Sequence, residues 1–314
     1  MSNPASVRLA VRAMRQEAHD VISCEFARAD HGALPDLSPG AHMDLQLPAG
    51  MVRQYSLVDW SRSHCTIAVK REPQGRGGSR FICDTLRVGD EVMAAGWRNT
   101  FALEEGKHPS VLLAGGIGLT PLLPMARRLE ALGRNWTLYV ATRSPEETPF
   151  LGALRAMGQR VYFAFEQAAP ARFDLSAIVQ THGLRAHYYA CGSNRLLDAF
   201  AAATTALPKS QVHLERFSPS PLKTGEGKLR VQLARSGRCV EVADDQTVLD
   251  ALLAEGVPMS HSCQQGICGQ CEVAVLAGLP DHRDSVLTDA ERARNDTMMV
   301  CCSRALSDEI VLDL

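Results

Sequence analysis

The sequence has no long uninterrupted run of apolar residues, no internal repeat and no low-complexity tract. A membrane-spanning helix needs about twenty predominantly apolar residues, so none is expected in this chain. The first twenty residues, MSNPASVRLAVRAMRQEAHD, carry arginines and acids where a secretion signal would have an apolar core and a cleavage site. We therefore expect a cytoplasmic protein that does not interact with a membrane.

Excess charge of one sign is also missing. The chain has 33 Lys and Arg against 35 Asp and Glu, which gives a formal net charge of -2. Proteins that hold nucleic acid or anionic membranes present a basic field, so nucleic acid is not an expected partner. The 46% hydrophobic and 22% charged residues are ordinary for globular domains. A chain of 314 residues exceeds what one core usually organises, which favours two or three domains.

The pattern of apolar, polar and turn-forming residues changes twice along the chain, which predicts three domains. Residues 1–103 contain short β-like runs between Gly, Pro and Asp turn signals, as in an antiparallel β-barrel. In residues 104–220 apolar strands alternate with amphipathic helices, the pattern of an α/β doubly wound parallel sheet. Residues 218–228, SPSPLKTGEGK, are typical of a solvated linker. Residues 228–314 predict a compact α+β domain.

Cysteine, by contrast, is abundant, with ten residues in the chain. In a reducing compartment, clustered thiols more often bind metal than form disulfides. The segment HSCQQGICGQC, residues 261–271, has the spacing C-x4-C-x2-C, and two adjacent cysteines follow further along the chain. Three ligands on one loop and a fourth from a distant strand are typical of a plant-type 2Fe-2S cluster. The predicted ligands are Cys263, Cys268, Cys271 and one of Cys301 and Cys302.

The residues between these cysteines suit a loop around a negatively charged cluster. Gly266 and Gly269 reach positive φ at little cost and leave backbone N–H groups exposed, and Ser262 adds little bulk. A structural zinc site is an alternative, although zinc modules usually combine two C-x2-C pairs. Buried thiols without a metal are another. Neighbours on a strand face opposite ways, so only one of Cys301 and Cys302 can point at a cluster, and we predict Cys301. The scattered cysteines are predicted to be small buried apolar residues: Cys24, Cys65, Cys83 and Cys239.

Two segments of the first domain suit a cofactor that carries a phosphate. In RQYSL, residues 53–57, an arginine can neutralise a phosphate and a tyrosine can stack on a planar ring. In GRGGSRFICDTL, residues 75–86, a glycine-rich turn precedes a helix-like run with Ser79 in its first turn, where free N–H groups can bind phosphate. Each segment also has a purely structural interpretation, as a half-buried strand or as a glycine loop with a serine cap.

The second domain contains three segments that suit a nicotinamide dinucleotide. LLAGGIGLTPLLPMARRL joins a strand, a glycine turn and a helix, a layout in which backbone N–H groups bind pyrophosphate, although it is not G-x-G-x-x-G. ACGSNRLLDAF ends another parallel strand, and ligands bind beyond such carboxyl ends. In ATRSPEE, Arg143 and Ser144 leave the choice between NADH and NADPH open. A plain glycine turn and a buried core cysteine remain the structural alternatives.

Together these motifs resemble the phthalate dioxygenase reductase family of the ferredoxin reductase superfamily. RQYSL, AVKR and GRGGS resemble its FMN-binding barrel, and GGIGLTP resembles its nicotinamide turn. The stretch from DHRDSVLTDAER to CCSRALSDEIVLDL resembles its C-terminal ferredoxin domain, a β-grasp fold. In that family the fourth cluster ligand stands where Cys301 is, and the position of Cys302 usually holds an aliphatic residue.

The resemblance also implies which residues bind the cofactors. For the flavin and its phosphate it implies Arg53, Tyr55, Ser56, Lys70, Gly78 and Ser79. For the nicotinamide dinucleotide it implies Gly115, Gly116, Gly118, Thr120, Pro121, Cys191 and Gly192, with Arg143 as a candidate. The segment HLERF, which resembles the part that closes the flavin pocket, adds Glu215 and Phe217, although an ordinary edge strand is the alternative there.

The resemblance implies an NADH-dependent oxidoreductase, the reductase component that passes electrons through FMN and a 2Fe-2S cluster to a Rieske-type oxygenase. Electron counting agrees, because nicotinamide delivers two electrons as a hydride, the cluster accepts one, and a flavin can hold zero, one or two. No acid–base residue needs to be catalytic. One alternative is an NAD(P)H-dependent reductase for another acceptor, such as a heme oxygenase, a ferric chelate or free flavin. The other is a non-catalytic redox sensor.

Overall fold

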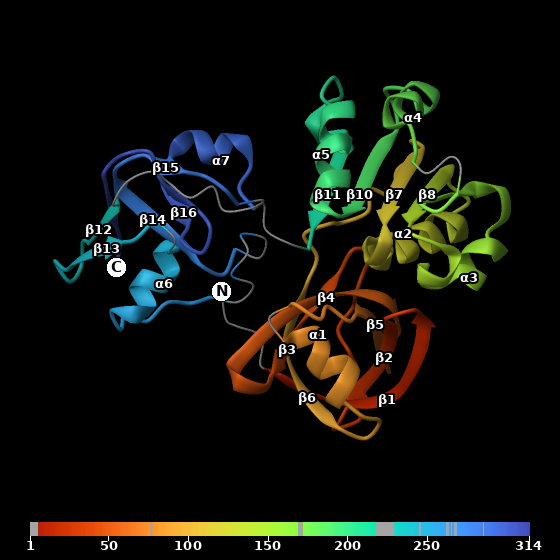
Figure 1. Cartoon of the computed structure of the whole chain (residues 1–314), viewed down its shortest axis with the longest axis horizontal. Coiled ribbons are helices and arrows are strands. Elements are labelled where there is room, and N and C mark those ends of the chain that lie inside the picture. Colours follow the sequence, from red (N-terminus) through yellow and green to blue (C-terminus); the bar gives the residue numbers. More distant parts are fainter. Residues whose placement is uncertain are drawn as a thin grey trace. The chain divides into compact units, whose positions relative to one another are not determined.

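The computed structural model describes residues 6–75, 77–168, 172–217, 229–244, 246–261, 264, 266, 269–284 and 286–314. The chain forms two compact units, Met1–Phe217 and Ser218–Leu314 (Figure 1). The predicted linker at residues 218–228 lies outside the described residues. Within the described part, no helix is both long and apolar enough to cross a membrane.

The first half of the first unit is the predicted antiparallel barrel. Its strands close in the order β1-β2-β5-β4-β3-β6. Buried and exposed residues alternate along β6, where Val92 and Ala94 point inward, because successive side chains leave a strand on opposite faces. Phe26, Leu45 and Ile67 are fully buried in the barrel core. The strands are β1 (Val7–Ala18), β2 (Val21–Arg28), β3 (His42–Leu47), β4 (Met51–Trp60), β5 (Cys65–Lys70) and β6 (Glu91–Arg98).

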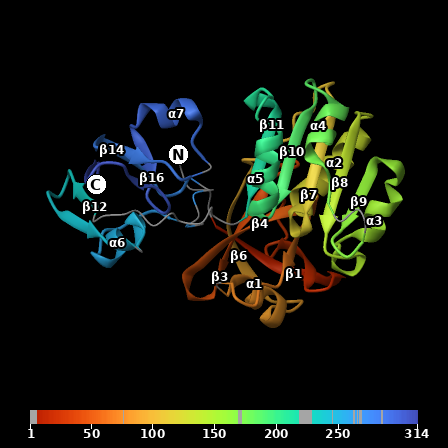
Figure 2. The same cartoon turned by 45° about the horizontal axis from the view of Figure 1, so that its top comes forward.

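The second half of this unit is a five-stranded parallel sheet in the order β11-β10-β7-β8-β9 (Figure 2). The strands are β7 (Ser110–Gly115), β8 (Trp136–Thr142), β9 (Val161–Phe165), β10 (His187–Gly192) and β11 (Val212–Arg216). Two helices pack on one face, α2 (Leu119–Ala131) and α3 (Leu151–Ala156). Two pack on the other, α4 (Leu175–His182) and α5 (Asn194–Ala203). The prediction of a doubly wound parallel sheet is confirmed.

The barrel and the parallel sheet pack against each other. Buried residues of the barrel, Val58 among them, contact Ile117 and Phe150 of the sheet half. Arg127 Nη1 of α2 donates a hydrogen bond to the carbonyl oxygen of Val58 over 3.2 Å. The two halves therefore form one unit, and the domain boundary predicted at residue 103 stays a prediction.

The second unit is the predicted α+β fold. Its main sheet has the order β13-β12-β18-β14-β16, in which β12 and β18 are parallel. Its strands are β12 (Leu229–Leu233), β13 (Cys239–Val242), β14 (Glu272–Ala277), β16 (Thr297–Met299) and β18 (Glu309–Leu312). A small ladder pairs β15 (Pro280–Asp281) with β17 (Arg304–Ala305). Among its described residues the unit has two helices, α6 (Val248–Ala254) and α7 (Asp289–Arg294).

Side-chain caps explain where both helices of the second unit begin. Thr247 accepts a hydrogen bond from the N–H of Asp250 at the start of α6. Thr288 and Glu291 form a reciprocal capping box at the start of α7. Such caps satisfy N–H groups that have no partner within the helix.

One prediction about the scattered cysteines was wrong. Cys24 and Cys65 are buried in the barrel and Cys83 is half-buried, but Cys239 is exposed. Cys239 begins β13, where Val240 and Val242 point into the core. The alternation of the strand therefore turns Cys239 toward solvent.

Candidate functional site

The predicted phosphate-binding residues of the barrel lie together although the sequence separates them. A Cβ atom built on Gly78 would lie 2.8 Å from Cγ of Arg53, so the arginine of β4 packs directly on this glycine. Gly78 begins the helical turn α1 (Gly78–Arg80), which continues as a short π-helix over Phe81–Thr85. Ser79 Oγ accepts a hydrogen bond from the N–H of Glu72 over 3.1 Å. A cationic side chain and a glycine-rich turn thus meet, as a bound phosphate requires.

Tyr55 and Lys70 lie on neighbouring strands of the same barrel. Tyr55 packs against the barrel core, and burial raises the pKa of its phenol above the ordinary range. The hydroxyl therefore stays protonated and can donate a hydrogen bond to a ligand. Lys70 is the last residue of β5, opposite Val21 of β2, and remains partly exposed.

Ser56 and Glu215 join the barrel to the parallel sheet. Ser56 Oγ of β4 donates a hydrogen bond of 3.4 Å to Oε2 of Glu215 on β11. Glu215 stands opposite Cys191 of β10 in the register of the two parallel strands. The hydroxyl, the carboxyl and the thiol therefore meet at the carboxyl end of the sheet. Ligands bind at this end in open α/β folds.

Burial makes both acidic groups at this point hold their protons. It raises the pKa of Glu215 to about 8, and the Ser56 hydrogen bond opposes part of the rise. The pKa of the Cys191 thiol is raised well above its ordinary value, first by burial and then by the nearby Glu215 charge. Near neutral pH the site therefore presents a largely neutral carboxyl and a neutral thiol, which can donate hydrogen bonds.

The glycine turn after β7 lies directly against the end of β10. A Cβ atom on Gly118 would lie 2.2 Å from the carbonyl oxygen of Cys191, and one on Gly192 would lie 2.9 Å from Cα of Gly115. Gly116 has a φ of 55°, in the left-handed region that favours glycine. Gly115, Gly118 and Gly192 therefore let two strand ends pack backbone against backbone, while a Cβ atom on Gly116 would meet nothing within 4 Å. A tight glycine turn at the end of a parallel strand suits a pyrophosphate or a nicotinamide ring.

The remaining nicotinamide candidates surround this turn. Thr120 is buried and its Oγ1 donates to the carbonyl oxygen of Ile117 over 3.0 Å, which braces the turn. Pro121 is buried in the first turn of α2, where a missing N–H costs nothing. Phe217 follows β11 and packs against the core between the sheet and α2.

Arg143 is held by an acid that the sequence interpretation did not single out. Its Nη1 lies 3.3 Å and 3.4 Å from the two carboxylate oxygens of Glu147. Ser144 is buried, and its carbonyl oxygen accepts a hydrogen bond from Thr148. A positive and a negative side chain thus stand together after β8. The spacing of four residues was no signal, because Arg143 lies in a bend and Glu147 in a short 3-10 turn and not on one α-helix.

Part of the predicted cluster site lies outside the described residues, namely Cys263 and Cys268. Cys271 and Cys301 are buried in the second unit. The N–H of Gly266 donates a hydrogen bond of 3.2 Å to Sγ of Cys301. Sγ of Cys302 instead faces the carbonyl oxygen of Met299 at 3.7 Å. Both cysteines lie in the turn after β16 and not on the expected strand, and Gly266 also packs against Sγ of Cys302. The loop therefore contacts both sulfurs, and Cys301 as the fourth ligand stays a prediction.

The described part of the cysteine loop fits a 2Fe-2S cluster. Gln264, Gly266 and Gly269 all have positive φ, with values of 56°, 67° and 74°. Turns that contain left-handed residues can present backbone N–H groups to an anion, and the N–H of Gly266 does so toward Sγ of Cys301. A Cβ atom on Gly266 would lie 2.4 Å from Sγ of Cys302, so no larger residue fits.

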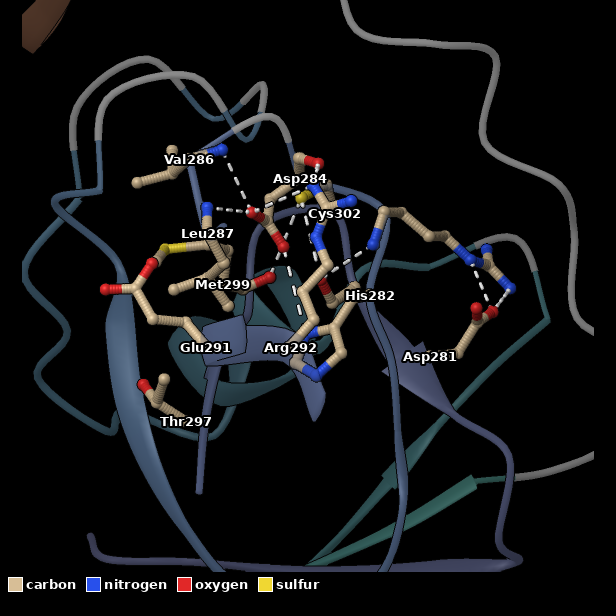
Figure 3. Close-up of polar contacts among 12 residues, drawn as sticks. Asp281, His282, Asp284, Val286, Leu287, Glu291, Arg292, Thr297, Met299 and Cys302 are labelled. Atoms are coloured by element: carbon tan, nitrogen blue, oxygen red, sulfur yellow. Dashed lines mark hydrogen bonds and ion pairs between the residues drawn. The ribbon is translucent and has the colours of Figure 1, made fainter. Parts of the chain in front are cut away.

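A buried polar group lies next to this loop and was not predicted (Figure 3). Asp284 accepts hydrogen bonds from the N–H groups of Val286 and Leu287, over 3.0 Å and 2.8 Å. Nη2 of Arg292 lies 3.7 Å from Oδ2 of Asp284, and Nδ1 of His282 lies 3.9 Å from Oδ1. The only sequence signal was an acid just before two apolar residues in the stretch DHRDSVL.

Comparison with known proteins agrees with this geometry. The family model for a 2Fe-2S iron-sulfur cluster binding domain matches residues 231–306. Phthalate dioxygenase reductase of Burkholderia cepacia is 37% identical over 98% of this chain and 97% of its own length. The chain belongs to the phthalate dioxygenase reductase family. Another relative, phenoxybenzoate dioxygenase subunit beta of Ectopseudomonas oleovorans, is 45% identical over 99% of this chain and 98% of its own length.

Solved structures show the same fold over the whole chain. A phthalate dioxygenase reductase, described as a modular structure for electron transfer from pyridine nucleotides to [2Fe-2S], matches with a TM-score of 0.74 and 36% identity. The match covers 99% of this chain and 98% of that one. An intact type IV self-sufficient cytochrome P450 monooxygenase matches with a TM-score of 0.85 and 38% identity, over 99% of this chain and 41% of that one.

Proposed function

We propose that this family member is the reductase component of an oxygenase system, which passes electrons from NADH through FMN and a 2Fe-2S cluster to a Rieske-type oxygenase. The observation that carries the proposal is the meeting of Ser56, Glu215 and Cys191 where the barrel joins the end of the parallel sheet. A flavin held by β4 and a nicotinamide at the end of β10 would face each other there.

On the flavin side, we assign the phosphate to Arg53, Gly78 and Ser79, whose packing supports one shared site. Tyr55 keeps its proton and would contact the ring system, with Lys70 on the neighbouring strand. When bound, FMN supplies the conversion between a two-electron donor and a one-electron acceptor. The chain contributes the alignment of the two rings, because hydride transfer requires close contact of the reacting atoms.

On the nicotinamide side, the glycine turn and Cys191 would position the dinucleotide, with Glu215 and Phe217 closing the pocket. The protonated Glu215 can donate a hydrogen bond, and it adds little charge next to a nicotinamide ring that becomes positive on hydride loss. We propose NADH as the donor, since the Glu147 carboxylate occupies Arg143 and would repel the extra phosphate of NADPH.

In the second unit, we assign the cluster to Cys263, Cys268, Cys271 and Cys301. The N–H of Gly266 on Sγ of Cys301 supports this choice, because N–H bonds to ligand sulfurs stabilise such clusters. We also propose three domains, with boundaries at residues 103, 220 and 228.

The test compares two adjacent cysteines as a matched pair. NADH-driven reduction of cytochrome c, a one-electron acceptor, is measured for the wild type, Cys301→Ser and Cys302→Ser. We expect Cys301→Ser to lose the visible absorbance of the cluster and most cytochrome c reduction, while reduction of ferricyanide by the flavin persists. Cys302→Ser should keep both activities. Equal cytochrome c reduction in all three proteins would place the cluster outside the electron path.

A second candidate acceptor is a heme oxygenase. The match to a self-sufficient cytochrome P450 monooxygenase over the full length of this chain favours it. The two candidates separate when purified reductase is mixed with a Rieske oxygenase or with a cytochrome P450. Product formation coupled to NADH consumption with only the P450 would replace the proposed partner.

A further inference from the structure

Buried polar groups next to the cysteine loop have no role in the electron path proposed above. The side chain of Asp284 is 0% exposed and that of His282 is 8% exposed. A charged group is costly to remove from water unless it is paired or hydrogen-bonded. A buried carboxyl group in this position therefore needs partners that offset the loss of water.

The contacts of Asp284 are those of a carboxylate ion. Its Oδ2 accepts two backbone N–H bonds, from Val286 and Leu287. Arg292 of α7 donates from Nη2 to the carbonyl oxygen of Asp284, and the same nitrogen lies 3.7 Å from Oδ2 (Figure 3). These N–H donors and the nearby guanidinium are the partners that a buried carboxylate requires. Asp284 thus carries a negative charge inside the second unit.

The other carboxylate oxygen accepts no hydrogen bond from the described residues. Within the described part of the chain, Oδ1 of Asp284 has no hydrogen-bond partner, and neither ring nitrogen of His282 has one. The Nδ1 atom of His282 lies 3.9 Å from Oδ1 of Asp284. Because the interior screens charge poorly, the field of this carboxylate extends to the neighbouring loop.

That loop is the one that surrounds the cluster ligand. A Cβ atom built on Gly266 would lie 3.0 Å from Cα of Asp284, so the two backbones are in contact. The N–H of the same glycine donates to Sγ of Cys301. Gly266 therefore lies between Asp284, which it meets at Cα and Cβ, and the sulfur of Cys301.

We propose that Asp284 and Arg292 set the reduction potential of the cluster from behind its loop. The cluster gains one negative charge on reduction, by an electron that NADH supplies through the flavin. The Asp284 carboxylate opposes this gain and lowers the potential, whereas the Arg292 guanidinium favours it and raises the potential. The inference rests on the proposed function, because it needs the cluster to be present.

The first variant is Asp284→Asn, studied in the full-length purified protein by a redox titration followed by electron paramagnetic resonance. Asparagine keeps the shape and can still accept the N–H bonds of Val286 and Leu287, but it loses the charge. We expect the reduction equilibrium to shift about tenfold toward the reduced form, which is a rise of about 59 mV for a one-electron couple. The matched control is Asp296→Asn, an exposed partner of Arg294, which should shift the equilibrium less than about twofold.

The second variant is Arg292→Gln, with Arg294→Gln on the same helix as its control. Removing this positive charge should shift the potential in the opposite direction, to more negative values. A loosened fold gives no reason for opposite shifts in the two variants, so the pair of signs separates the field of the charges from structural damage.

Equal potentials in Asp284→Asn and Asp296→Asn would overturn the inference, as would a positive or absent shift in Arg292→Gln. If Asp284→Asn fails to retain its cluster, the sign for Arg292→Gln decides alone. A wild-type protein without a 2Fe-2S signal would instead contradict the proposed function, so the two failures are distinguishable.

Discussion

Glu215 offers the most quantitative test of the site, because burial raises the pKa of its carboxyl group to about 8 from an ordinary value of 4.5. The folded protein therefore keeps a proton that the unfolded chain releases above pH 4.5. Stability falls with pH wherever the folded state binds more protons than the unfolded state. Glu215 thus stabilises the fold at low pH, and this contribution is lost as the pH rises toward 8.

The substitution Glu215→Gln replaces the carboxyl group with a neutral amide of the same shape. Each pKa unit corresponds to about 1.36 kcal/mol. Between pH 4.5 and pH 7 the unfolded wild type ionises Glu215 and the folded one does not, which lowers its free energy of unfolding by about 3 kcal/mol. Glu215 retains some contact with solvent, which reduces this cost. We expect the variant to be more stable than the wild type by about 1–3 kcal/mol at pH 7, and by little at pH 4.5.

The assay is urea unfolding of the full-length protein at pH 5, 6, 7 and 8, followed by tryptophan fluorescence in the absence of nicotinamide. All three tryptophans, Trp60, Trp97 and Trp136, belong to the first unit, so their emission reports the unfolding of that unit alone. Glu166→Gln, which removes an exposed carboxylate of the same unit, serves as the control.

The reasoning about burial is refuted by either of two results. One is a Glu215→Gln protein that is no more stable than the wild type at pH 7. The other is a stability difference that stays constant between pH 5 and pH 8, because a carboxyl group with an ordinary pKa would give no slope in this range.

Two further substitutions test the nicotinamide side. Gly118→Ala should destabilise the first unit by more than about 2 kcal/mol and raise the KM for NADH, since its Cβ would lie 2.2 Å from the carbonyl oxygen of Cys191. Gly152→Ala, which has open space around it, is the control, and equal stability of the two variants would count against a tight turn. Glu147→Gln releases Arg143 and should raise the ratio of kcat/KM for NADPH over NADH about two- to fivefold. An unchanged ratio would remove this pair from coenzyme choice.

Much of the fold could be predicted because the pattern of each element has a direct physical cause. The alternating run at Glu91–Arg98 has one face in the barrel core, and the unbroken apolar run at Ser110–Gly115 is a central strand buried on both faces. Helix α6 begins where Thr247 supplies the side-chain oxygen that a helix start requires. Helix α7, which Thr288 caps in the same way, was not predicted.

Contacts between elements that are distant in the sequence could not be predicted. Nothing local links Ser56 to Glu215, and the raised pKa of the carboxyl depends on their burial at the junction of barrel and sheet. Asp284 lies within the stretch DHRDSVLTDAER, but the role we propose for it depends on Gly266 packing against its backbone. Cys239 was misassigned because a strand-like pattern does not say which face of an edge strand its first residue occupies.

The most direct test of the central claim is an anaerobic titration of the purified protein with NADH, followed by visible absorbance and electron paramagnetic resonance, with the released flavin identified afterwards. We predict bleaching of a flavin and of a 2Fe-2S cluster, a one-electron signal from the cluster, and free FMN. A colourless protein that contains zinc, or one in which NADH reduces a flavin but no cluster, would contradict the account.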